Sequence, residues 1–140
     1  MLLEQVTDRQ VATAAPGDSI ATVARTMRED NVGAVVVSAA GKVDGIVTDR
    51  DVALAVAGEG FSPDEPISSI MTKDVKTIWE DQGVFNATQY LSGYKFRRLP
   101  VIDRQDNLVG IVTLDDFVGL FSRELFNVAK SLEPSLGESV

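Results

Sequence analysis

Two pairs of polar side chains occupy matching places in the chain, each directly after a short apolar run. Thr48 and Asp51 follow the first run, and Thr113 and Asp116 follow the second, 65 residues later. An ionised carboxylate can accept hydrogen bonds from two vicinal hydroxyl groups, and such charge-assisted bonds are about twice as strong as neutral ones. A Thr at a strand end and an Asp one helical turn onward project to the same place. The pattern therefore suits a ligand site or a helix cap.

The same two pairs of residues could each cap the start of a helix. A Thr followed three residues later by an acidic residue is a capping-box pattern, in which each residue bonds the backbone N–H of the other. Capping boxes favour Glu or Gln at the third position, whereas both copies carry the shorter Asp at 51 and 116. The residues alone leave both roles open, and the two roles are compatible.

The two pairs belong to a longer internal duplication. Val11 and Thr13 match Val75 and Thr77 at an offset of 64, and the offset becomes 65 only after the turn at 38–42. A single insertion inside a turn is what two diverged copies of one fold would show. The period is too long for a solenoid repeat and suits a small unit that packs against its twin.

The apolar periodicity predicts the same order of elements in each copy: strand, helix, strand, strand, helix. In the first copy we expect a strand within 10–15, a helix from Asp18 or Ser19 to about 31, strands at 32–38 and 43–47, and a helix from Thr48 or Asp49 to Gly58. In the second copy we expect a strand near 75–78, a helix at about 84–93, strands at 99–103 and 108–112, and a helix from about 114.

The predicted fold class is α+β, with two β-α-β-β-α repeats packed together by a pseudo-two-fold axis. We place repeat 1 at 6–57, a Gly- and Pro-containing linker at 58–69, repeat 2 at 70–121, and a C-terminal helix and tail at 122–140. An apolar stripe at helical spacing supports that C-terminal helix, and we expect the chain to fray from Pro134. The stripe consists of Phe121, Leu125, Val128 and Leu132.

Composition excludes several classes of site. Cysteine and histidine are both absent, which removes disulfides, thiolate nucleophiles, imidazole bases and His- or Cys-based zinc sites. Without a nucleophile–base pair, we expect a protein that is not an enzyme. The formal net charge of −8 repels phosphates and anionic lipid, so neither nucleic acid nor a membrane is an expected partner. The N-terminal residues do not begin a signal peptide and no apolar run could span a bilayer, which predicts a cytoplasmic protein.

The chain resembles a tandem pair of cystathionine-β-synthase (CBS) domains, often called a Bateman module. The resemblance covers about residues 6–121 and rests on three motifs in order. Residues 70–72 read Ile-Met-Thr, and residues 97–103 read Arg-Arg-Leu-Pro-Val-Ile-Asp. The third motif ends both copies, at residues 45–51 and 110–116, and has the pattern Gly–apolar–x–Thr–x–x–Asp, where x is any residue. Each motif alone is weak, but together and duplicated they make a strong match.

The resemblance implies binding of an adenosine-containing ligand in clefts between the repeats. It implies that Asp51 and Asp116 bond the ribose hydroxyls and that Thr48 and Thr113 lie near the ribose or phosphate. Main-chain groups of the first strand would flank the adenine, and a basic pair would reach the phosphates. Those groups are Thr13, Ala14, Ala15, Thr77, Ile78, Trp79, and the pair Arg97 and Arg98.

Some of these residues have plain structural alternatives. Trp79 is expected in the core unless it borders the adenine, and Arg97 with Arg98 would otherwise be solvated surface charge. Repeat 1 carries Gly33-Ala34 where repeat 2 carries the two arginines, so the two sites are expected to be unequal.

The functional hypothesis is a stand-alone regulatory module. It would bind AMP, ADP, ATP or an S-adenosylmethionine-type compound, with or without Mg²⁺, form a homodimer, and signal to a separate effector protein. The alternative is a protein-interaction or scaffolding module whose ligand clefts are vestigial.

Overall fold

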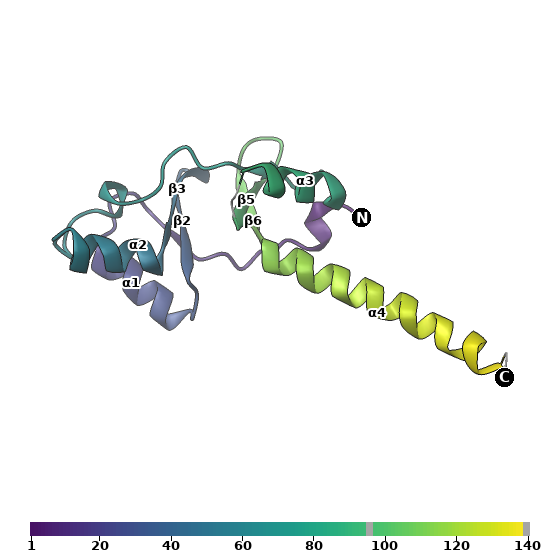
Figure 1. Cartoon of the computed structure of the whole chain (residues 1–140). Helices are drawn as coiled ribbons and strands as arrows, with labels where there is room; N and C mark the ends of the chain where they lie inside the picture. The colour runs from purple at the N-terminus through teal and green to yellow at the C-terminus, as the bar shows by residue number, and fades with distance from the viewer. Residues whose placement is uncertain (95–96, 139–140) are drawn as a thin grey trace.

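The fold is described by a computed structural model over residues 1–94 and 97–138 (Figure 1). Both repeats show the predicted order of strand, helix, strand, strand, helix, which confirms the α+β class. Repeat 1 consists of β1 (Thr13–Ala14), α1 (Ile20–Glu29), β2 (Ala34–Ala39), β3 (Lys42–Thr48) and α2 (Asp49–Ala53), which continues as a π-helical turn (Leu54–Gly58). Repeat 2 consists of β4 (Ile78–Trp79), α3 (Val84–Tyr94), β5 (Arg98–Ile102), β6 (Leu108–Thr113) and α4 (Leu114–Glu138).

Each repeat contains one three-stranded sheet with the same topology. The orders are β1-β2-β3 and β4-β5-β6; the first pair in each sheet is parallel and the second is antiparallel. The register shifts once in each sheet, after Val37 in β2 and after Val101 in β5, positions 64 residues apart. The duplication seen in the sequence therefore extends to an irregularity of the backbone.

Local sequence signals explain where α1 begins and which face it buries. The Ser19 hydroxyl accepts a hydrogen bond from the Thr22 N–H at 3.1 Å, which satisfies one of the free donors at the helix start. Ile20, Val23 and Met27 follow at helical spacing and are buried against the sheet of repeat 1. Such a one-sided apolar stripe favours a helix packed on a sheet.

The segments that precede each repeat cross to the opposite repeat. Leu3 is fully buried in the core of repeat 2, and its counterpart Ile67, 64 residues later, is fully buried in the core of repeat 1. The N-terminus accordingly lies beside α3 (Figure 1). Isolated bridges repeat the exchange with the same symmetry: Leu2 with Gly83 and Ser19 with Pro66, then Asp8 with Ile111 and Ile46 with Thr72.

This exchange gives the segment 58–69 a second role. It connects the repeats, as a linker does, but it also completes the core of repeat 1 through Phe61 and Ile67. Two short 3₁₀ helices hold the crossing segments in place, at Leu3–Gln5 and Ile67–Ser69.

Two glycines permit the close approach of the crossing segments. A Cβ on Gly110 of β6 would lie 2.4 Å from Thr7 Cγ2 and 2.5 Å from the Asp8 carbonyl oxygen. A Cβ on Gly45 of β3 would lie 2.6 Å from Met71 Sδ. Glycine at both positions therefore allows the crossing segment to bond the strand edge.

Helix α4 has two parts with different surroundings. Phe117 and Leu120 in its first turns are buried in the core of repeat 2, whereas the later turns project away from the body (Figure 1). The sequence predicted that the chain frays from Pro134. This prediction is wrong for residues 134–138, because α4 continues through the proline to Glu138. Residues 139–140 lie outside the described residues. A proline removes one backbone donor, and on an exposed helix solvent can hydrate the freed carbonyl. Across the described part of the chain, no helix has the length and apolarity needed to cross a bilayer.

Candidate functional site: two equivalent clefts

The Thr–Asp pair of repeat 1 forms a reciprocal capping box where β3 ends and α2 begins. The Thr48 N–H donates to Asp51 Oδ2 at 2.9 Å, and the Asp51 N–H donates to Thr48 Oγ1 at 3.2 Å. Both residues are half-buried. The capping role weighed from the sequence is therefore present.

The pair in repeat 2 has the same geometry. The Thr113 N–H donates to Asp116 Oδ2 at 2.9 Å, and the Asp116 N–H donates to Thr113 Oγ1 at 3.1 Å. Within residues 1–94 and 97–138, Oδ1 of Asp51 and Oδ1 of Asp116 accept no hydrogen bond from the protein. The cap thus fixes one carboxylate oxygen and leaves the other available to a ligand.

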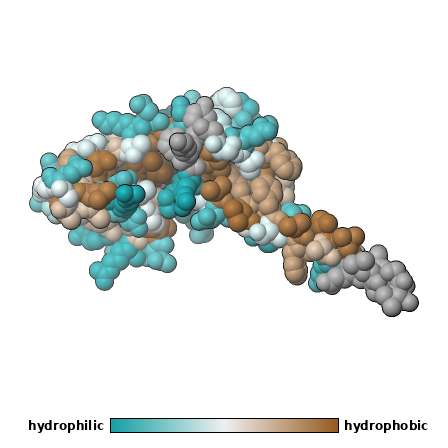
Figure 2. Space-filling view, viewed as in Figure 1, coloured by the Kyte–Doolittle hydropathy of each residue, from teal (hydrophilic) through white to brown (hydrophobic). Residues whose placement is uncertain are grey.

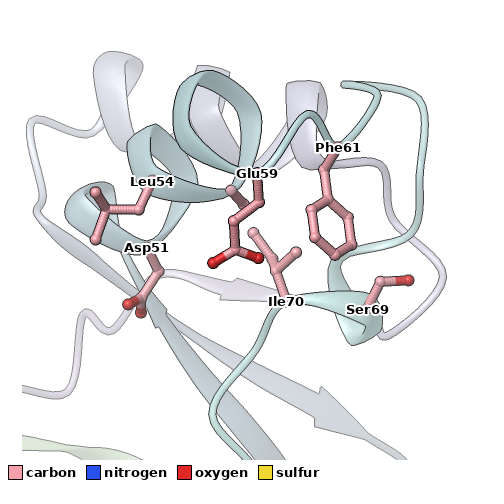
Figure 3. A pocket seen from close by; sticks show the side chains of 7 residues that line it. Asp51, Leu54, Glu59, Phe61, Ser69 and Ile70 are labelled. Carbon is pink, nitrogen blue, oxygen red and sulfur yellow. The ribbon is translucent and has the colours of Figure 1, made fainter.

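Asp51 borders a cleft of about 240 Å³ that apolar and polar side chains line together (Figure 3). Leu54 and Ala55 come from the π-helical turn after α2. Phe61 and Ile70 come from the segment that leads into repeat 2 and packs against repeat 1. Glu59 and Ser69 complete the lining. Residues of the crossing segment were missed by sequence reasoning, although Ile70 belongs to the Ile-Met-Thr motif.

Asp116 borders the equivalent cleft, of about 370 Å³, in repeat 2. Its opposite wall is the N-terminal crossing segment, in which Gln5 and Val6 take the places of Ser69 and Ile70. The full lining is Gln5, Val6, Thr7, Asp8, Asp115, Asp116, Gly119 and Arg123. Two pseudo-symmetric clefts, each with one motif Asp, are therefore built into the fold.

The residues predicted to flank the adenine lie elsewhere. Thr13, Ala14 and Ala15 are on or beside β1, and they do not line the cleft of Asp51. The strand order explains this separation: β1 lies two strands from the end of β3, or about 10 Å at the usual strand spacing.

In repeat 2, Thr77, Ile78 and Trp79 line a separate cavity of about 270 Å³. Gln82, Tyr90, Ile102 and Asp106 complete its lining, and Asp116 is not among them. The predicted adenine contacts and the motif Asp thus line no common cavity among those described, and the adenine role of these residues stays a prediction.

Trp79 is not a core residue, which corrects the structural alternative offered from the sequence. Its side chain is 41% exposed, because it follows the buried Ile78 and successive residues of a strand face opposite sides. The Arg104 guanidinium lies 3.9 Å from the ring centroid, a cation–π contact. Arg104 also donates to both carboxylate oxygens of Asp81, at 2.8 and 3.0 Å, and these bonds hold the pKa of Asp81 below its ordinary value.

Arg97 and Arg98 lie beside the motif of repeat 2. Both side chains are exposed, and they line a cavity of about 120 Å³ with Thr113, Leu114 and Asp115. Arg98 also reaches repeat 1, because a Cβ on Gly33 would lie 3.7 Å from Arg98 Nη2. A Cβ at position 33 would therefore be in ordinary van der Waals contact with this guanidinium.

Neither cleft supplies a ready metal site or a catalytic apparatus. Within the described ranges, no group of three or more acidic residues is arranged to hold a metal ion. The described linings of the two clefts together present carboxylates, one guanidinium, and a mixture of polar and apolar side chains.

Comparison with known proteins identifies the family to which the duplicated unit belongs. The family model of the CBS domain matches residues 3–58 and again residues 67–123. The CBS domain-containing protein YhcV of Bacillus subtilis is 38% identical over 107 residues, which are 76% of each chain.

Solved structures that share the fold include two CBS-domain proteins at 30% and 34% identity. The CBS-domain pair of protein MJ0100, in complex with 5′-methylthioadenosine and S-adenosyl-L-methionine, is 30% identical with a TM-score of 0.78, over 89% of this chain and 98% of that one. A CBS-domain-containing protein of Agrobacterium tumefaciens, ATU1752, is 34% identical with a TM-score of 0.73, over 86% of this chain and 98% of that one. This chain belongs to the CBS-domain family, and its two repeats are a tandem pair of CBS domains.

Proposed function

We propose that this CBS-domain pair is a regulatory module that binds an adenosine-containing ligand in the clefts beside Asp51 and Asp116. The observation that carries the proposal is the state of these two carboxylates. Each has Oδ2 fixed by the N–H of its Thr and Oδ1 without a hydrogen-bond donor among the described residues, and each borders a cleft. The adenosyl compounds in the structure of the similar MJ0100 pair support this ligand class.

The chemistry of the ribose explains why a fixed carboxylate suits it. Vicinal hydroxyls donate two hydrogen bonds, and an ionised carboxylate has acceptor positions for both. Because the capping bond already orients the side chains of Asp51 and Asp116, a ligand would lose little affinity to their ordering. In repeat 1, Leu54, Phe61 and Ile70 would cover the apolar parts of the ligand.

The crossing segments provide a route from ligand to shape change. Each cleft has one wall from the helix of a repeat and another from the segment that leads into the opposite repeat. The affinity of a ligand that contacts both walls depends on how the two repeats are placed. A ligand that binds one arrangement of the repeats more tightly shifts the population toward that arrangement. The signal would pass to a separate effector protein.

Helix α4 supports the proposed homodimer. Six apolar residues follow one another at alternating spacings of four and three along α4, and each is between 38% and 71% exposed. We call them the α4 stripe: Leu114, Val118, Phe121, Leu125, Val128 and Leu132. Figure 2 shows hydrophobic residues along the projecting part of this helix. Such spacing is typical of a seam between paired helices, and a second copy of the chain would present the same stripe.

A thermal-shift panel tests the ligand proposal. Wild type is mixed with AMP, ADP, ATP with and without Mg²⁺, 5′-methylthioadenosine or S-adenosylmethionine, with GTP as the control nucleotide. A ligand at a hundred times its dissociation constant stabilises by about 2.7 kcal/mol, and an adenosyl compound should do so while GTP does not.

Variants of the clefts complete the test. Asp51→Ala and Asp116→Ala should each reduce the shift, whereas Ser19→Ala is the matched control because it removes a helix cap at a residue that lines neither cleft. An absence of any shift in wild type would contradict the proposal and favour the alternative, a protein-interaction module with vestigial clefts.

A further inference from the structure

The helical walls of the two equivalent clefts end in lining residues of opposite charge. Asp51 corresponds to Asp116 and Leu54 to Gly119, both 65 residues apart, and these residues line the two clefts in the same way. The last lining residue of the helical wall is Glu59 in the first cleft, after Ala55, and Arg123 in the second.

Glu59 and Arg123 are not equivalent in the sequence, because the residue 65 positions after Glu59 is Glu124, but each lines its cleft at the end of the helical wall. Repeat 1 has a π-helical turn at Leu54–Gly58, whereas the corresponding part of α4 is an α-helix. A π turn contains more residues than an α turn, so it delays the next residue that faces the cleft. Glu59 comes eight residues after Asp51, and Arg123 comes seven residues after Asp116. Neither position belongs to the repeated Thr–Asp motif.

Glu59 faces into the cleft of repeat 1. Figure 3 shows its carboxylate between Leu54 and Ile70, on the same side of the helical segment as Asp51. The lining that the structure describes for this cleft contains these two carboxylates and no basic side chain. A phosphate placed here would meet two negative charges beside apolar walls, where charges are screened less than in bulk water.

The cleft of repeat 2 offers one guanidinium to a phosphate. Arg123 lines it directly, and Asp115 is shared between this cleft and the cavity of Arg97 and Arg98. Asp8, Asp115 and Asp116 also line this cleft, so the two clefts do not differ in net charge. They differ because the described lining of the second cleft includes a guanidinium, which can donate charge-assisted hydrogen bonds directly to a phosphate. The larger volume, about 370 Å³ against about 240 Å³, also accommodates a larger ligand.

We infer that the two clefts select adenosyl ligands by the charge of the 5′ group. The cleft of Asp51 takes a compound with a neutral or cationic 5′ group, because Glu59 disfavours a phosphate there. The cleft of Asp116 takes the phosphate-bearing compound, held by Arg123. This inference rests on the proposed binding function, and it makes Glu59 and Arg123 the specificity-determining residues.

The test isolates one cleft at a time. In an Asp116→Ala background, calorimetric titration with AMP and with 5′-methylthioadenosine reports on the cleft of Asp51. Adding Glu59→Gln should strengthen AMP binding about threefold to sevenfold, the effect of removing one negative charge about 7 Å from a phosphate that carries one to two charges in water. The affinity for uncharged methylthioadenosine should change less than twofold. Glu29→Gln is the matched control, since Glu29 is exposed at the end of α1 and lines neither cleft.

The reciprocal arm uses an Asp51→Ala background with Arg123→Gln, which should weaken AMP by a similar factor and leave methylthioadenosine unchanged. Equal changes for the two ligands, or none, in titrations where both bind would overturn charge selection but leave the binding function intact. A wild type that binds neither ligand would overturn the binding function as well. Unfolding midpoints without ligand confirm that each variant is folded.

Discussion

Replacing Gly110 by Ala tests the exchange of segments on which both clefts depend. A Cβ there would lie 2.4 Å from Thr7 Cγ2 and 2.5 Å from the Asp8 carbonyl oxygen. The second atom belongs to the backbone, so no rotamer change relieves the contact and the crossing segment must move. Overpacking of this kind typically costs about 1–3 kcal/mol. We expect the upper half of that range, or a melting temperature lower by about 6–12 °C for a chain of this size.

The equivalent substitution provides an internal comparison. A Cβ on Gly45 would lie 2.6 Å from Met71 Sδ, which can rotate away, and 2.8 Å from the Thr72 carbonyl oxygen. We therefore expect Gly45→Ala to cost less than Gly110→Ala. Gly17→Ala is the control, because its Cβ would have no described neighbour within 4 Å.

Urea and thermal unfolding of the three variants measure the difference. Because residues 5–8 line the cleft of Asp116, Gly110→Ala should also weaken a ligand bound there. If Gly110→Ala is as stable as Gly17→Ala, the N-terminal segment does not lie over β6 and the described cleft is incorrect.

Three further outcomes follow from packing and charge. Leu3→Ala and Ile67→Ala should each cost about 2–5 kcal/mol in urea unfolding, because both side chains are fully buried; a negligible cost for Leu3→Ala would mean a frayed N-terminus. Leu125→Glu should convert a dimer to a monomer in analytical ultracentrifugation, and an unchanged assembly would exclude the α4 stripe from the interface. Arg104→Gln should raise the pKa of Asp81 toward its ordinary value in an NMR titration. The stability that this ion pair contributes is present near neutral pH and is lost as the pH falls through the lowered pKa, so an unchanged titration would contradict the pairing.

Much of the fold could be predicted because local patterns determine it. The alternation of apolar runs and turns predicted the order of strands and helices, and Ser19 and Thr48 both cap the helices that follow them. The repeated Thr–Asp pairs were identified from spacing alone, because one helical turn is enough to bring the two side chains together.

The exchange of segments could not be predicted in the same way, because it depends on contacts between residues distant in the sequence. A signal was present, since Leu3 and Ile67 are related by the same offset of 64 as the rest of the repeat. The boundaries 6–57, 58–69 and 70–121 remain predictions, and the structure adds that residues 58–69 pack against repeat 1.

The placement of the predicted adenine contacts illustrates a second limit. Sequence order places Thr77 and Trp79 at the first strand of a repeat, but the strand order of the sheet decides how far they lie from Asp116. The π-helical turn that precedes Glu59 likewise could not be predicted from the spacing of apolar residues. In the sequence, one extra residue in a turn looks the same as the ordinary end of a helix.

The most direct test of the central claim removes a ribose hydroxyl from the ligand. Calorimetric titration of wild type with AMP and 2′-deoxy-AMP, and with 5′-methylthioadenosine and its 2′-deoxy analogue, isolates the bond proposed for Asp51 and Asp116. Hydrogen bonds to a charged group contribute about 1.5–3 kcal/mol, so we predict that each deoxy compound binds at least about tenfold more weakly. The ribose role of the two carboxylates is contradicted if each deoxy compound binds as tightly as its parent.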